Sequence, residues 1–285
     1  MSKVDFFIIG APKCGTTALA KNLDNNPSIV ISNPKEPHYF TTDFIDYKKA
    51  KDLEEYHSSC FPAEKHSDVI WGDASIWTMY SEEGLNNIKK YNPDARIVIM
   101  LRNPAKAAFS LHQQMIFQKK EPVRSFRDAW LRSDERFKRN IDTNNNIDSK
   151  LISYKHAFSF RSQLKRVYEI FPSEQIFIGT QEDYIRDGVL YINRVEAFLG
   201  ARIFKHAMNA KTNETFYMNN KFVMDLLRHP VTVKVAVGAK RVLGIKSWGL
   251  GRPAARITAD DIKLVYTDLA DDIAAVEADF GIKLT

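Results

Sequence analysis

The chain has 285 residues, with 41 Lys and Arg against 35 Asp and Glu, which gives a formal net charge of +6. Hydrophobic residues make up 44% and charged residues 27%, the usage of ordinary globular proteins, so a fibrous or wholly disordered chain is excluded. Two cysteines are too few for a disulfide framework, and no apolar run resembles a signal peptide or approaches the roughly 20 residues of a bilayer span, so we expect a soluble, cytoplasmic protein.

Short β-branched runs alternate along the chain with longer segments of helical pattern. The expected strands are four apolar runs, at residues 5–9, 29–31, 96–101 and 175–178. The expected helices cover residues 18–23, 105–117, 126–137, 154–171 and 184–199, and an amphipathic helix follows Thr258 near the C-terminus. This alternation predicts an α/β fold, a parallel sheet flanked by helices with a P-loop-like phosphate-binding turn. No linker separates the segments, so we expect a single domain over residues 1–285.

Two stretches interrupt the alternation. Residues 134–150 contain three consecutive Asn among many charges, and we expect a surface loop there. Residues 228–256 contain no Asp or Glu but carry seven Lys and Arg. This basic segment is compatible with contact to an anionic substrate, with peripheral contact to a membrane, or with an ordinary solvated charged face.

The turn after the first strand carries the clearest chemical signal. A strand that ends at Gly10 runs through a loop containing Gly15 into a helix opened by Thr16 and Thr17. This arrangement points backbone N–H groups and a helix N-terminus at a phosphate. In the nucleoside-triphosphate motif a Lys follows the second Gly, whereas here Thr16 stands there and Lys13 lies inside the loop. None of the four expected strands ends in a clear Walker-B aspartate, so the displaced lysine favours a different leaving group.

A second anion site is predicted after the third strand. Arg102 stands at the end of that strand, and Ser110 follows eight residues later, about two helical turns along the next helix. The two side chains could hold one phosphate from two sides. The alternatives are an ordinary ion pair for Arg102 and a hydroxyl bonded to its own helix backbone for Ser110.

Three motifs in this order resemble one enzyme family. They are GAPKCGTTAL at residues 10–19, KEPHYF at residues 35–40 and IVIMLRNPAKAAFSLH at residues 97–112. Together they resemble the sulfotransferases that use 3′-phosphoadenosine 5′-phosphosulfate (PAPS), and most of all the bacterial branch related to heparan sulfate sulfotransferases. Weaker matches at residues 182–184, 198–200 and 251–257 extend the resemblance over nearly the whole chain.

The resemblance implies a role for each matching position in donor binding. Arg102 and Ser110 would hold the 3′-phosphate, and the loop would bind the 5′-phosphosulfate, with Lys13 following the charge onto the departing phosphate. That loop consists of Pro12, Lys13, Cys14, Gly15, Thr16 and Thr17. Gly251 and Arg252 match part of a loop that closes over the donor. Leu250 replaces a lysine usual in that loop, and residues 73–75 replace a Lys-Thr-Pro-like segment.

The resemblance also implies that Glu36 is the base that takes the proton of the acceptor hydroxyl. Burial beside Pro37, Tyr39 and Phe40 is expected to raise the pKa of Glu36 toward neutrality. His38 is the rival base. The alternative for Glu36 is a structural ion pair with Lys35 or Lys13.

Other reactive residues lead to no further site. Cys14 is interpreted as a small residue tolerated beside phosphate rather than as a redox thiol. His57, Cys60 and His66 lack a fourth ligand and the usual close pairing, so no metal is expected.

The sequence therefore predicts sulfuryl transfer from PAPS, as co-substrate, to a hydroxyl acceptor, with a carbohydrate or glycoconjugate favoured over a lipid or small molecule, and no nucleic acid partner. The alternatives are a P-loop kinase-like phosphotransferase and a non-catalytic nucleotide- or nucleic-acid-binding protein.

Overall fold

The computed structural model describes residues 2–44, 50–62, 64–139, 148–206 and 256–284, together with the backbone of residues 141–142, 147, 217–218 and 251–252. The chain divides into two compact units, one formed by residues 1–209 with 257–285 and the other by residues 210–256. In the second unit, β8 (Tyr217–Met218) pairs antiparallel with β9 (Gly251–Arg252).

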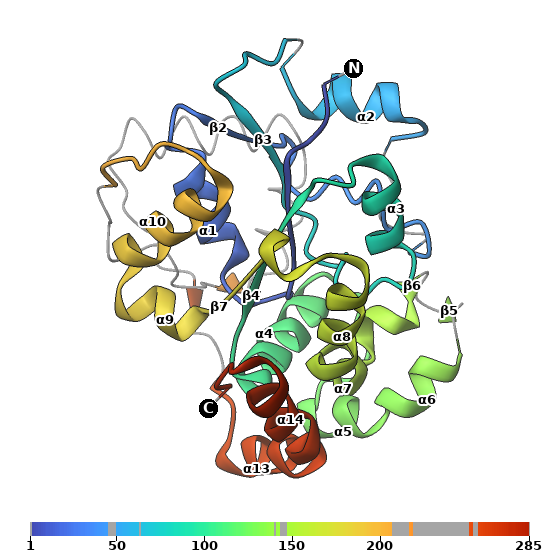
Figure 1. Ribbon diagram of the computed structural model, residues 1–285. Coiled ribbons are helices and arrows are strands. Elements are labelled where there is room, and N and C mark those ends of the chain that lie inside the picture. The colour runs from blue at the N-terminus through green and yellow to red at the C-terminus, as the bar shows by residue number, and fades with distance from the viewer. Residues whose placement is uncertain are drawn as a thin grey trace. The chain divides into compact units, whose positions relative to one another are not determined.

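The first unit is built on a five-stranded sheet with the order β2-β3-β1-β4-β7 (Figure 1). Its strands are β1 (Phe6–Gly10), β2 (Ile29–Ile31), β3 (Ile70–Asp73), β4 (Arg96–Leu101) and β7 (Ile176–Thr180). Every pairing in this sheet is parallel. The predicted α/β fold with a parallel sheet is confirmed.

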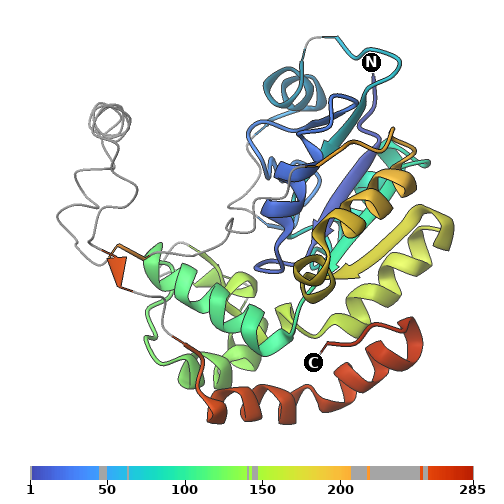
Figure 2. The same ribbon diagram turned by 90° about the vertical axis from the view of Figure 1, so that its left-hand side faces the viewer.

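Both faces of the sheet are buried because successive side chains of a strand point to opposite sides. Phe6 and Ile8 of β1 pack into one apolar cluster with α1 (Thr16–Leu23), α9 (Gln181–Arg186) and α10 (Gly188–Leu199). Phe7 and Ile9 pack into the opposite cluster. The helices of that second cluster are α2 (Leu53–Cys60), α3 (Gly84–Tyr91), α4 (Pro104–Phe117), α5 (Phe126–Leu131), α7 (Tyr154–Ala157), α8 (Phe160–Ile170), α13 (Ala259–Asp268) and α14 (Ala270–Phe280). Figures 1 and 2 show α1, α9 and α10 on one side of the sheet and α8 on the other.

Several predicted helices are each divided into two. The helix expected at 184–199 is two helices, because the side chain of Asp187 accepts the backbone N–H of Leu190 at 3.0 Å and starts α10. The segments expected as single helices at 126–137, at 154–171 and after Thr258 are likewise each two helices.

The prediction of a surface loop over residues 134–150 is wrong in part. Helix α6 (Ser133–Lys138) occupies its start, and the two-residue strands β5 (Ile141–Asp142) and β6 (Ile147–Asp148) pair antiparallel before the 3₁₀ turn η1 (Ser149–Ile152). A second 3₁₀ turn, η2 (Ser173–Gln175), precedes β7.

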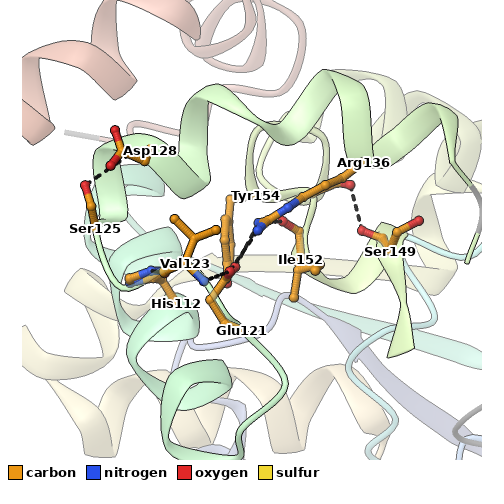
Figure 3. Close-up of polar contacts among 10 residues, drawn as sticks. His112, Glu121, Val123, Ser125, Asp128, Arg136, Ser149, Ile152 and Tyr154 are labelled. Atoms are coloured by element: carbon orange, nitrogen blue, oxygen red, sulfur yellow. Dashed lines mark hydrogen bonds and ion pairs between the residues drawn. The ribbon is translucent and has the colours of Figure 1, made fainter. Parts of the chain in front are cut away.

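A buried ion pair ties the segment after α4 to the α5–α7 region (Figure 3). The Glu121 side chain is fully buried and accepts two hydrogen bonds from Arg136, at 2.7 and 2.8 Å. Its carboxylate also accepts the Tyr154 hydroxyl at 2.9 Å and the Val123 N–H at 2.7 Å. Val123 in turn bonds through its carbonyl to His112 of α4 at 2.9 Å. This network holds α4, the helix that carries Ser110, against its neighbours.

Removing one partner of this pair should destabilise the fold strongly. In Arg136→Leu the Glu121 carboxylate stays buried without its cation, and we expect the free energy of unfolding to fall by about 3–5 kcal/mol. The measurement is denaturant unfolding. Arg139→Leu is the matched control, because Arg139 and its partner Glu135 are exposed, and it should cost less than about 1 kcal/mol. Equal losses for the two variants would contradict this account.

Candidate functional site

The turn after β1 has the geometry of an anion cradle. Gly15 caps α1 with a left-handed φ of 91°, a conformation open to glycine at little cost. A Cβ atom at Gly15 would lie 3.0 Å from the side-chain nitrogen of Gln181. Within the part of the chain that the structure describes, the backbone N–H groups of Gly15, Thr16 and Thr17 have no hydrogen-bond acceptor. These donors are therefore available to an anion.

Two cationic side chains meet at this turn. The Arg102 guanidinium, at the end of β4, donates a hydrogen bond to the backbone carbonyl of Lys13 at 3.2 Å. Burial is the main cause that lowers the pKa of Lys13, and the charge of Arg102 lowers it further, whereas the charge of Glu36 opposes the shift. Arg102 makes no ion pair with any described residue, so the structural alternative proposed from the sequence is not observed there.

Ser110 lies on α4, and the residues at the start of this helix fix where it begins. The Asn103 side chain caps the helix by accepting the Lys106 N–H at 3.1 Å, and Pro104 occupies the first turn. Ser110 is partly exposed, and its hydroxyl makes no hydrogen bond to the described part of the chain. The hydroxyl is thus free to face a ligand instead of its own helix.

Glu36 and His38 lie close together on the loop after β2. Their backbones are both left-handed, with φ of 64° and 52°. The His38 ring is buried, and its Nε2 lies 3.6 Å from Oε2 of Glu36. Lys35 forms an ion pair with the same carboxylate, so the alternative of a salt bridge with Lys35 is realised.

The expected rise in the pKa of Glu36 is wrong. Burial by itself raises this pKa, as the sequence suggested, but the adjacent His38 ring and the ion pair with Lys35 outweigh it and lower the pKa to about 2. The carboxylate is therefore ionised throughout the neutral range and ready to accept a proton, as a weaker base than expected.

One residue near the cradle was missed. Gln181 opens α9 directly after β7 and lies over Gly15, as the contact above shows. Its position at the carboxyl end of a parallel strand was a usable signal, since ligands of open parallel sheets bind at that edge.

The remaining residues predicted for the site are Gly251, Arg252 and Cys14. Gly251 and Arg252 form β9 of the second unit, and the basic segment otherwise lies outside the described residues, except for Arg256. Burial strongly raises the pKa of the Cys14 thiol, which is consistent with an inert residue. Among the described residues there is no cluster of three potential metal ligands and no helix with the length and apolar character to cross a membrane.

Comparisons with known proteins point to one family. A family profile described as "Sulfotransferase domain" matches residues 3–224. Human carbohydrate sulfotransferase 15 is 28% identical over 145 residues, covering 37% of this chain and 26% of the human protein. The bifunctional heparan sulfate N-deacetylase/N-sulfotransferase 1 of Caenorhabditis elegans is 29% identical over 112 residues, covering 39% of this chain and 13% of that protein. The chain thus matches about a quarter or less of the length of these relatives.

A solved structure shares the fold over the full length. The sulfotransferase from Alicyclobacillus acidocaldarius superposes with a TM-score of 0.72 at 23% identity and covers 100% of this chain and 98% of its own. At this identity the likeness establishes the architecture.

The low pKa of Glu36 predicts a pH-dependent stability. Because this pKa lies below the ordinary 4.5, the carboxylate stabilises the fold above about pH 4.5, and that contribution is lost as the pH falls toward 2. In Glu36→Gln the change in unfolding free energy across this window should shrink by about 1–2 kcal/mol, allowing for solvent screening of the pair. Unfolding by urea at a series of pH values is the measurement. Identical pH dependence in both proteins would refute the assignment.

Proposed function

Since the chain belongs to the sulfotransferase domain family, we propose that it transfers a sulfuryl group from PAPS to a hydroxyl group, and that residues 1–285 work as one sulfotransferase domain. The observation that carries the proposal is the hydrogen bond from Arg102 to the Lys13 carbonyl, which joins two anion-binding elements at one edge of the sheet.

The donor has two anionic ends, and the site offers two groups of donors for them. The unpaired N–H groups of Gly15, Thr16 and Thr17, with Pro12 and Cys14 completing the loop, suit the 5′-phosphosulfate. Arg102 and Ser110 suit the 3′-phosphate that distinguishes PAPS from ordinary adenine nucleotides. Gly251 and Arg252 are proposed to close over the bound donor.

Two residues are assigned to the transfer itself. Glu36, held ionised by its neighbours, accepts the proton of the attacking hydroxyl as the new oxygen–sulfur bond forms. Lys13 neutralises the charge that develops on the phosphate oxygen as the bond from that oxygen to sulfur breaks. Because a carboxylate with so low a pKa is too weak a base to deprotonate a free alcohol, it accepts this proton while the oxygen–sulfur bond forms and not before.

A carbohydrate or glycoconjugate is the acceptor that we propose. The relatives reported above are named for carbohydrate and heparan sulfate substrates, and they align over part of their length only. A kinase-like phosphotransferase is the second candidate, favoured by the cradle alone. It fits less well, because Thr16 occupies the position of the catalytic lysine.

The first test is the choice between nucleotides. Adenosine 3′,5′-bisphosphate should raise the melting temperature at concentrations at which ADP does not, because only the bisphosphate fills the Arg102–Ser110 site. In Arg102→Ala this preference should shrink to less than about a tenth of its wild-type value. Thermal unfolding with each ligand is the measurement. Equal shifts for both nucleotides, or a shift with ATP that requires magnesium, would favour the kinase.

The second test separates chemistry from donor binding. Glu36→Gln keeps the size of the side chain but loses the proton acceptor, so turnover should fall by about 10²–10⁴-fold while affinity for the bisphosphate stays within a factor of about two. Transfer from labelled PAPS to a panel of sugars gives the turnover, and calorimetry gives the affinity. His38→Ala is the matched comparison and should lose less. If His38→Ala is inactive and Glu36→Gln is not, the base is the histidine.

A further inference from the structure

A buried carboxylate lies directly behind the loop that carries Glu36. Asp73 is the last residue of β3, the strand between β2 and β1, and it is only 1% exposed. It stands at the carboxyl end of its strand, the same edge at which Arg102 and the turn after β1 lie. Neither donor binding nor proton transfer, as assigned above, uses it.

The two oxygens of Asp73 are held by neutral hydroxyl groups. Oδ1 accepts the Ser75 hydroxyl at 2.6 Å, and Oδ2 accepts the Tyr56 hydroxyl at 2.8 Å. No Lys or Arg among the described residues forms an ion pair with it. A buried carboxylate without a cationic partner costs free energy, so its presence calls for a reason.

The hydrogen bonds continue from Asp73 to the catalytic loop. The Ser75 oxygen that donates to Asp73 also accepts the backbone N–H of His38 at 2.9 Å. A serine hydroxyl has one proton, so giving it to Asp73 leaves the lone pairs of Ser75 facing the His38 N–H. Asp73 therefore orients the Ser75 hydroxyl so that its oxygen accepts the hydrogen bond from the His38 backbone N–H.

The loop needs such support. Glu36 and His38 both have positive φ, a conformation that costs a non-glycine residue of order 1–3 kcal/mol and persists only where the surroundings hold it. The His38 carbonyl accepts the Thr41 hydroxyl at 3.0 Å, and its N–H is the one bound by Ser75. The backbone of His38 is therefore held from both sides.

The side chains of Glu36 and Asp73 both lie near the His38 ring. The His38 ring lies 3.6 Å from the Glu36 carboxylate, and it also interacts electrostatically with Asp73. Burial raises the pKa of Asp73, and the hydrogen bonds from Ser75 and Tyr56 together with the His38 charge oppose that rise.

We propose that Asp73 is a positioning residue for the transfer reaction: through Ser75 it fixes His38, and through His38 it holds the Glu36 carboxylate at the acceptor hydroxyl. This inference rests on the proposed function. Asp73 touches neither donor nor acceptor, and its effect is confined to the geometry of the base. A displacement of the order of 1 Å at a reacting group costs about 10²-fold in rate.

The experiment is a double-mutant cycle on turnover with labelled PAPS. Asp73→Asn should lower kcat by about 10- to 100-fold with unchanged affinity for the bisphosphate. In a Glu36→Gln background the same change should have no further effect, because the base that Asp73 positions is already gone. Ser75→Ala, which removes the link to His38 but keeps the Asp73 carboxylate, should reproduce the kcat loss and serves if Asp73→Asn does not fold.

The control is a second buried carboxylate that lies away from the loop. Glu196 of α10 accepts Asn26 at 2.8 Å and His206 at 2.7 Å. Glu196→Gln should lower the melting temperature without lowering kcat. The inference would be overturned if the double variant lost kcat by the product of the losses in Asp73→Asn and Glu36→Gln. It would also be overturned if Asp73→Asn kept full turnover. A wild-type chain that transfers no sulfuryl group would instead overturn the proposed function, and this inference with it.

Discussion

The parallel pairing of β1 with β3 on one side and with β4 on the other brings three parts of the candidate site to one edge of the sheet. In a parallel sheet the carboxyl ends of neighbouring strands meet at one edge, so the turn after Gly10, the guanidinium of Arg102 and the carboxylate of Asp73 come together without a long connection. The Arg102 bond to the Lys13 carbonyl then fixes the first of these against the second. The helices cover the faces of the sheet, and two of them carry Thr16 and Ser110.

Opposite charges divide the site into two functions. The side proposed to bind the donor consists of backbone N–H groups with Lys13 and Arg102, where burial and mutual repulsion lower the pKa of Lys13. The side proposed to bind the acceptor consists of Glu36, which burial alone would tend to neutralise and which Lys35 and His38 keep ionised. In the proposed reaction the cations bind the anionic donor, and the carboxylate accepts the proton of the acceptor alcohol. This arrangement suits sulfuryl transfer, in which positioning and charge stabilisation do most of the work.

The sequence predicted those features that follow from one local pattern. β1, β4 and β7 are mostly apolar runs, and the turn with Gly15 at the start of α1 follows directly after the first of them. β3 was missed because its four residues, Ile70–Asp73, end in Gly and Asp, which are uncommon in strands. The pKa of Glu36 was predicted with the wrong sign, since burial is readable from aromatic neighbours, whereas the direction in which Lys35 and His38 point depends on a left-handed backbone. Gln181 could have been placed at the sheet edge because it follows a strand, but its contact with Gly15 joins segments far apart in the chain and follows only from the fold.

The central claim is that one sheet edge holds both phosphate-bearing ends of PAPS. A crystal structure with adenosine 3′,5′-bisphosphate tests it most directly, because the nucleotide carries both phosphates without the reactive sulfonyl group. We expect the 5′-phosphate to accept hydrogen bonds from the N–H groups of Gly15, Thr16 and Thr17, and the 3′-phosphate to lie within hydrogen-bond distance of Arg102 and Ser110. A nucleotide with its phosphates exchanged between these two places, or bound away from the turn after β1, would contradict it.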